Sequence, residues 1–171
     1  MARNIEIKAR LADPQGVHRR AAQLATAGPL VLEQDDSFFE SREGRLKLRC
    51  APEGAELIAY RRADESGPKL SEYWRSPVPE PDSMRELLAQ SLGLTGRVQK
   101  RRVLFMAGRT RIHLDEVLGL GHFMELEVVL AEGEASEAGE AEADALMQAL
   151  RIPPEARVRT AYVDLLKQAS N

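Results

Sequence analysis

The chain contains 171 residues, a length that fits one domain with a single hydrophobic core. Hydrophobic residues make up 43% and charged residues 30%, a composition typical of folded globular proteins rather than disordered ones. The net charge is −3, and no apolar run approaches the roughly 18 residues that a membrane-spanning helix needs, so a membrane protein is not expected.

Acidic residues are concentrated at positions 131–145, which hold six acidic residues and no basic one. We interpret this segment as a solvated linker that leads into a helix rather than as a binding surface. The rest of the chain is only mildly basic, so nucleic-acid binding is not expected. The N-terminus lacks the apolar core of a signal peptide, which predicts a cytoplasmic protein. The single cysteine, Cys50, excludes an internal disulfide and a cysteine-based zinc site.

Alternation of apolar and polar residues with period two predicts a protein built mainly of β-strands. Glycine-containing turns at 42–44, 53–54, 66–68 and 107–108 favour antiparallel connections between successive strands. In chain order, we expect strands over residues 4–11, 29–40, 45–49, 54–62, 69–77, 97–106, 111–115 and 124–130.

Helical spacing of apolar residues separates some of these strands. A helix over 14–26 is expected to begin after Asp13, because Pro14 is favoured at the first helical position. Further helices are expected over 81–92 and 136–150, followed by a short helical element at 158–168. The whole chain, 1–171, is therefore predicted to be a single domain of the α+β class with mainly antiparallel strands.

The polar faces of the predicted strands are sorted by charge. Lys47 and Arg49 share one strand face, Lys100 and Arg102 share another, and Glu125 and Glu127 share a third, while Glu6 and Lys8 lie together. One interpretation is a set of solvated faces with weak cross-strand ion pairs. The other is a closed barrel whose charged faces point inward. Such a lumen would suit a polyphosphate with a bound magnesium ion.

Other familiar catalytic sites are absent from the sequence. There is no Walker A loop, GxGxxG, HExxH or GxSxG motif. Cys50 at a strand end is expected to pack rather than to act as a nucleophile. We expect His18 to be exposed and His122 to lie in a glycine turn. His113 shares its strand face with Arg111 and Asp115, and a hydrogen-bonded structural role is expected for it.

Several segments together resemble the CYTH superfamily, the triphosphate tunnel metalloenzymes that include class IV adenylyl cyclases and thiamine triphosphatases. Residues 4–8, NIEIK, resemble the family signature ExExK. GRLKLR at 44–49, KRR at 100–102, TRIHLDEVLGLGHFMELEVV at 110–129 and AYVDLL at 161–166 follow in family order. The block at 110–129 is the most specific and is most similar to the class IV adenylyl cyclase-like bacterial branch.

The resemblance implies an eight-stranded antiparallel barrel, or tunnel, with helices packed outside and a triphosphate bound inside with Mg²⁺ or Mn²⁺. It implies catalytic roles for Lys8, Arg102 and Asp115. The phosphate-binding residues that it implies are Lys8, Lys47, Arg49, Lys100 and Arg102, with Arg62 and Arg111 as weaker candidates. The implied metal ligands are Glu6, Glu125 and Glu127, together with Asp115 as a metal ligand or an orienting group.

The first Glu of the ExExK signature is replaced by Asn4 in this chain. An amide oxygen can bind a cation but brings no negative charge, so the change is expected to weaken metal binding or to remove one of two ions. Three functions stay open. The first is an adenylyl cyclase that converts ATP to cyclic AMP and pyrophosphate, and the second is a triphosphatase acting on inorganic triphosphate, thiamine triphosphate or a nucleoside triphosphate. The third is a triphosphate-binding module without catalysis. A homodimer is the default expectation for the assembly.

Overall fold

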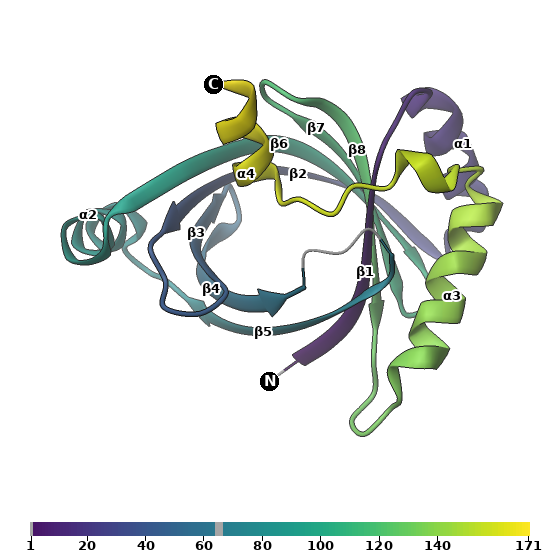
Figure 1. Cartoon of the computed structure of the whole chain (residues 1–171), viewed down its shortest axis with the longest axis horizontal. Helices are drawn as coiled ribbons and strands as arrows, with labels where there is room; N and C mark the ends of the chain where they lie inside the picture. Colours follow the sequence, from purple (N-terminus) through teal and green to yellow (C-terminus); the bar gives the residue numbers. More distant parts are fainter. Residues whose placement is uncertain (1, 64–66) are drawn as a thin grey trace.

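The protein is a closed barrel of antiparallel strands, and Figure 1 shows it viewed along the barrel interior. The computed structural model describes residues 2–63 and 67–171. Around the barrel the strands follow the order β1-β5-β4-β3-β2-β6-β7-β8. The predicted eight-stranded barrel is confirmed. Its strands are β1 (Ala2–Arg10), β2 (Ala27–Phe39), β3 (Arg45–Ala51), β4 (Gly54–Arg62), β5 (Lys69–Pro77), β6 (Leu94–Ala107), β7 (Thr110–Val117) and β8 (Gly121–Val129).

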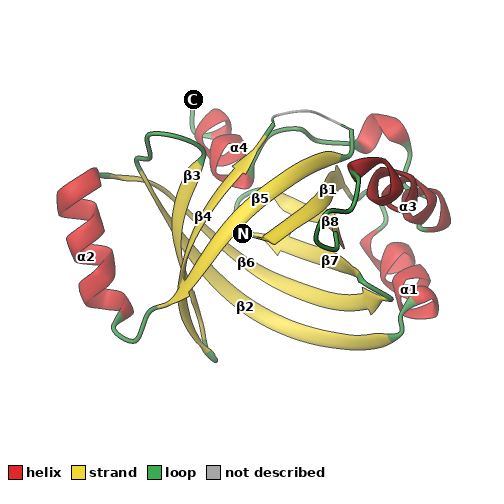
Figure 2. Cartoon of the chain, turned by 90° about the horizontal axis from the view of Figure 1, so that it is seen from below, coloured by secondary structure: helices red, strands yellow, loops and turns green. Residues whose placement is uncertain are grey.

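The described residues form four α-helices, which lie outside the strands, as the apolar spacing predicts. They are α1 (Pro14–Leu24), α2 (Pro81–Leu92), α3 (Ser136–Ala149) and α4 (Tyr162–Ala169), with a 3₁₀ turn at Pro154–Ala156. The side chain of Asp13 accepts a hydrogen bond from the Gly16 amide at 2.9 Å, which caps the start of α1. Figure 2 shows α2 at one end of the molecule and α1 and α3 at the other.

The last helix begins later than the predicted element at 158–168, because the residues before it run beside β1. Ala9 and Arg157 form an isolated antiparallel bridge, and the amide of Val158 donates to the carbonyl of Lys8 at 2.9 Å. This segment leads from the 3₁₀ turn to α4 across one end of the barrel (Figure 1). The C-terminal residues thus approach the charged side of β1.

The turns between neighbouring strands join antiparallel pairs, as expected. Gly44 has a φ of 68°, and a Cβ at this position would lie 2.3 Å from the carbonyl oxygen of Tyr60, so only glycine fits the β2–β3 connection without strain. The expected turn at Ser66–Pro68 lies partly outside the described residues. Among the described residues, no helix combines the length and apolar character needed to cross a membrane.

The apolar faces of β1 and β8 point outward, against the helices, and not into the barrel. Ile5 and Ile7 of β1 are fully buried with Leu126 of β8, in a cluster that also contains Ala143 and Met147 of α3. Because side chains alternate along a strand, this arrangement directs Glu6 and Lys8 to the opposite, inner face. The hydrophobic core under α1 and α3 therefore fixes which charged residues face the lumen.

Candidate functional site

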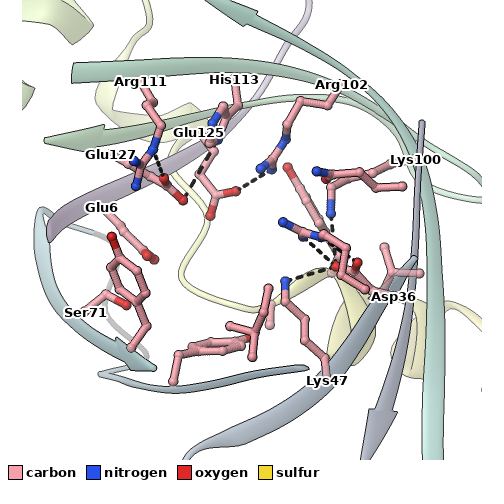
Figure 3. Close-up of a pocket in the computed structure, with 18 of the residues that line it drawn as sticks. Glu6, Asp36, Lys47, Ser71, Lys100, Arg102, Arg111, His113, Glu125 and Glu127 are labelled. Carbon is pink, nitrogen blue, oxygen red and sulfur yellow. Dashed lines mark hydrogen bonds and ion pairs between the residues drawn. The ribbon is translucent and has the colours of Figure 1, made fainter. Parts of the chain in front are cut away.

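The barrel encloses a charged cavity of about 370 Å³. Within the described ranges, eight basic and six acidic side chains line it, together with the aromatic rings of Phe38, Tyr60, Tyr73 and Tyr162. Of the two interpretations of the sorted polar faces, the inward-facing one is thus correct. Figure 3 shows the charged side chains in two groups on different sides of the cavity.

The first group, called here the carboxylate cluster, consists of Glu6, Glu125 and Glu127. Strand register brings these residues together, since Glu6 of β1 pairs with Glu127 of β8. Arginines neutralise part of the charge: Arg62 lies 2.8 Å from Glu6 and 3.6 Å from Glu125, and Arg111 lies 2.7 Å from Glu127. The arginines predicted as weaker phosphate contacts therefore contact carboxylates in this structure; Figure 3 shows the contact between Arg111 and Glu127.

The carboxylates of this cluster differ in acidity. Burial raises the pKa of Glu6, and repulsion from Glu125 and Glu127 adds to the shift while Arg62 opposes it. Burial would also raise the pKa of Glu125, but the charges of Lys8 and Arg102 outweigh it and hold that pKa well below its usual range. Closely spaced buried carboxylates of this kind favour a cation between them.

The second group, called here the basic cluster, consists of Lys47, Arg49 and Lys100 and surrounds Asp36. Lys47 and Lys100 lie 2.9 and 3.3 Å from Asp36 Oδ2, and Arg49 donates to both carboxylate oxygens at 2.8 and 2.7 Å. Although burial opposes ionisation, these three cations hold the pKa of Asp36 well below its usual range. One carboxylate thus partly neutralises three cations from β3 and β6.

Two lysines that face the lumen, Lys8 and Lys100, have lowered pKa values. Burial, opposed by Asp36 and reinforced by the nearby Arg49, lowers the pKa of Lys100 to about 7. Burial similarly lowers the pKa of Lys8 to about 8, although Glu125 favours its charged form. Lys8 also lies over the ring of Tyr162, 4.1 Å from its centroid, and donates to the carbonyl of Thr160 at 3.4 Å. A bound anion would restore the charge of both lysines.

Arg102 of β6 connects Glu125 of the carboxylate cluster to Asp115 of β7. Its Nε and Nη2 atoms donate to the two oxygens of Asp115, each at 2.7 Å, and Nη2 also donates to Glu125 at 2.9 Å. Tyr162 donates its hydroxyl hydrogen to Asp115 at 2.8 Å. The oxygens of Asp115 therefore lie against Arg102 and Tyr162, and Nη2 of Arg102 bridges Asp115 to Glu125 of the carboxylate cluster.

His113, for which a hydrogen-bonded structural role is expected, lies beside the carboxylate cluster. Its Nδ1 is buried, has no hydrogen-bond partner in the described part of the chain, and lies 4.0 Å from Glu127 Oε1. Burial and the nearby Arg102 lower the pKa of His113 to about 4, so the ring is uncharged at neutral pH. Donor atoms of His113, Glu125 and Glu127 all lie within 4.8 Å of one another, close enough to share one cation.

Asn4 faces the same cavity from β1, two residues before Glu6. Its Oδ1 atom is buried and has no hydrogen-bond partner among the described residues. An amide oxygen in this state can accept a cation or a ligand donor, but it adds no charge to the carboxylate cluster.

Sequence reasoning missed several residues of this site, among them Asp36 and Tyr162. Asp36 is buried at the centre of the basic cluster, and the only local signal was an acidic pair, Asp35 and Asp36, inside a predicted strand. Tyr162 lies in the AYVDLL segment, whose aromatic ring had no predicted contact. Both residues contact strands far away in the sequence, which period-two patterns cannot reveal.

Comparison with known proteins agrees with the fold. No curated protein matches the chain. Among solved structures, the PH1012 protein of Pyrococcus horikoshii is 22% identical, with a TM-score of 0.84 over 95% of this chain and 99% of that chain. A protein of Vibrio parahaemolyticus named as a candidate adenylate cyclase is 19% identical, with a TM-score of 0.76 over 96% and 97% of the two chains.

A third similar structure is HpAC1 of Hippeastrum, described as a candidate adenylyl cyclase with a dominant triphosphatase activity. It is 15% identical, with a TM-score of 0.66 over 96% of this chain and 95% of that chain. At these identities the likeness establishes a shared fold. The family model of the CYTH domain matches residues 2–162, nearly the whole chain, and the chain therefore belongs to the CYTH domain family.

Proposed function

We propose that this protein is a metal-dependent enzyme that binds a small-molecule triphosphate in the barrel lumen and catalyses displacement at one of its phosphorus atoms. The observation that carries the proposal is that the basic cluster and Lys8 line the same cavity as the carboxylate cluster. Figure 3 shows Lys47 and Lys100 across the cavity from the three glutamates. Unpaired buried charges are costly, and a polyanion with a divalent cation would satisfy both groups at once.

The cation fits the residues that are present. Glu6, Glu125 and Glu127 provide hard oxygen ligands suited to Mg²⁺ or Mn²⁺. The Oδ1 atom of Asn4 is a further oxygen that has no hydrogen-bond partner within residues 2–63 and 67–171. When bound, such an ion neutralises charge on phosphoryl oxygens and on the leaving phosphate. Because Asn4 lacks the charge of the signature Glu, we expect this site to bind the metal ion more weakly than a site with four carboxylates would.

The basic residues supply binding and orientation. Lys47, Arg49 and Lys100 would exchange part of their contact with Asp36 for phosphate oxygens, as charge-assisted hydrogen bonds. Arg102, held at two atoms by Asp115, presents a fixed positive charge to the reacting phosphate. Lys8 completes the set from β1. In this proposal, the role of Asp115 is to orient the side chain of Arg102.

ATP cyclisation is the reaction to test first. In this reaction the ribose 3′-oxygen attacks the α-phosphorus, the bond to the bridging oxygen breaks, pyrophosphate leaves and the hydroxyl proton passes to solvent. The aromatic side chains that line the lumen, Phe38, Tyr60, Tyr73 and Tyr162, would cover an adenosine group at the end of the triphosphate.

Hydrolysis of a triphosphate is the second candidate reaction. Water attacks the terminal phosphorus, the bond to the bridging oxygen breaks, orthophosphate and the corresponding diphosphate are formed, and a proton passes to solvent. The dominant triphosphatase activity described for the Hippeastrum protein supports including it. The third candidate, triphosphate binding without turnover, is supported by the uncharged Asn4 in place of the first signature carboxylate.

Product analysis separates these functions. The protein is incubated with ATP, thiamine triphosphate or inorganic triphosphate, each with Mg²⁺ and with Mn²⁺. Cyclic AMP with pyrophosphate identifies a phosphorus–oxygen lyase, and orthophosphate release identifies a hydrolase. Binding without product favours the binding module, and Asn4→Glu would then be expected to raise turnover. Absence of both binding and product for all three compounds would refute the proposal.

A further inference from the structure

The imidazole of His113 has an unpaired nitrogen beside the carboxylate cluster. It projects from β7 into the lumen, where strand register places it opposite Glu125 of β8 and Leu104 of β6. The residue is 4% exposed, and its Nδ1 atom has no hydrogen-bond partner in the described parts of the chain. A buried nitrogen without a hydrogen-bond partner destabilises the folded protein, and a ligand bound at this atom would remove that cost.

The distances around Nδ1 favour a shared cation over a hydrogen bond. Glu127 Oε1 is 4.0 Å away, which is too long for a direct hydrogen bond. Two donors bound at about 2.1 Å to one cation can lie up to about 4.2 Å apart. The donor atoms of His113, Glu125 and Glu127 lie within 4.8 Å of one another, so small side-chain rotations would bring all three to one ion.

The arginines around the cluster leave carboxylate oxygens available on this side. Arg111 binds Oε2 of Glu127, and Oε1 is the atom that faces His113. Arg102 binds Oε2 of Glu125, while Oε1 lies 3.6 Å from Arg62. The arginines thus hold each carboxylate in place by one oxygen, as residues around metal ligands commonly do.

We propose that His113 Nδ1, with one oxygen each from Glu125 and Glu127, binds a divalent transition-metal ion, so that the site prefers Mn²⁺, Co²⁺ or Zn²⁺ to Mg²⁺. The preference follows from the donor set, because imidazole nitrogen suits transition metals whereas Mg²⁺ selects oxygen. This inference rests on the proposed function in one respect, since it takes Glu125 and Glu127 as ligands of the same ion.

Electron spin echo spectroscopy of bound Mn²⁺ tests the inference without any substrate, because a directly bound ¹⁴N nucleus modulates the echo. The chain contains three histidines, so each can be removed separately. We expect ¹⁴N coupling in the wild type and its loss in His113→Gln. It should persist in the matched control His122→Gln, because His122 is exposed at the start of β8. His113→Asp replaces the nitrogen ligand with an oxygen ligand, and we expect this variant to bind Mn²⁺ without nitrogen coupling.

Calorimetric titration of the same variants measures the preference. In His113→Gln we expect Co²⁺ and Zn²⁺ to bind roughly 10- to 100-fold more weakly, and Mg²⁺ to change less than about 3-fold. Bound Mn²⁺ without nitrogen coupling, coupling that survives in His113→Gln, or no binding of Mn²⁺ at millimolar concentration would overturn the inference. Nitrogen coupling in a protein that neither binds nor turns over a triphosphate would refute the proposed function alone. Turnover without coupling would refute the histidine ligand alone.

Discussion

Asp36 organises the basic half of the lumen, although its own charge opposes that of a phosphate. Its two oxygens accept hydrogen bonds from Lys47, Arg49 and Lys100, and its side chain is almost completely buried. Without this carboxylate the three cations would repel one another in a low-dielectric cavity. We infer that Asp36 keeps the basic cluster assembled before a ligand enters.

Asp36→Asn should therefore destabilise the free protein by about 3 kcal/mol, the scale expected when one partner of a buried ion pair is removed. The free energy of unfolding in urea measures this loss. Asp35→Asn is the matched control, because Asp35 pairs with Arg97 on the exposed face of the same strand and such pairs contribute little. Added inorganic triphosphate should recover more stability in Asp36→Asn than in the wild type. Equal losses in the two variants would contradict this role.

Lys100 makes the protein sensitive to pH in a definite direction. Its pKa is about 7 in the folded protein and near 10.4 in an unfolded chain. Between these values the unfolded state binds more protons, so this residue makes the free protein more stable as the pH rises from 7 towards 10. A bound triphosphate reverses the shift, because its negative charge favours the protonated lysine.

Triphosphate binding at pH 8.5 should consequently take up protons, and in Lys100→Met the uptake should fall by about one proton. Calorimetry in two buffers of different ionisation enthalpy gives the number directly. Lys167→Met, at an exposed lysine of α4, should leave the uptake unchanged. The same uptake in the wild type and in Lys100→Met would show that Lys100 does not face the ligand.

At the scale of single elements, the close approach of α3 to the barrel determines the orientation of β1. Gly139 is buried in α3, and a Cβ there would lie 2.8 Å from both Ile5 Cγ1 and Leu130 Cδ2. Because Ile5 alternates with Glu6 along β1, the packing that buries Ile5 also holds Glu6 in the lumen. An apolar helix contact thus positions a residue of the carboxylate cluster.

Gly139→Val should destabilise the protein by about 2 kcal/mol through overpacking, even though valine is a better helix former than glycine. Urea unfolding gives the size of the effect. Ala141→Val on the exposed face of the same helix adds similar bulk without a neighbour and should cost only about 0.5 kcal/mol. Similar losses at the two positions would mean that α3 tolerates a wider spacing from β1.

At the scale of the whole molecule, the site exists only when the barrel is closed. The carboxylate cluster comes from β1 and β8, whereas the basic cluster and Asp36 come from β2, β3 and β6. An unfolded chain cannot present these groups together, so a triphosphate should bind the folded state alone and raise its apparent stability.

At 100 times its dissociation constant, inorganic triphosphate should stabilise the protein by about 2.7 kcal/mol, which raises the melting temperature by about 5 to 10 °C. Thermal unfolding with and without triphosphate measures this shift. We expect the shift to shrink strongly in Arg49→Ala and Arg102→Ala. It should persist in Arg101→Ala, because Arg101 points away from the lumen and pairs loosely with Glu33 at 3.6 Å. Full shifts in all three variants would contradict an internal binding site.

The sequence by itself determined the elements and the face on which each charged residue lies. Glu6 and Lys8, Lys47 and Arg49, and Glu125 and Glu127 were assigned to common faces by period two, because that period is a local property of an extended chain. Helix starts such as Pro14 after Asp13 were also readable, since capping involves only neighbouring residues. The sequence pattern left open whether those faces met solvent or one another.

Only the tertiary structure decided which residues meet inside the barrel. Asp36 meets Lys100 across 64 positions of sequence, and Tyr162 meets Asp115 across 47. The placement of His113 beside Glu125 and Glu127 likewise depends on the register between β7 and β8. Closure and register are set by pairing between distant strands and by the helices packed outside them, and local alternation carries no information about either.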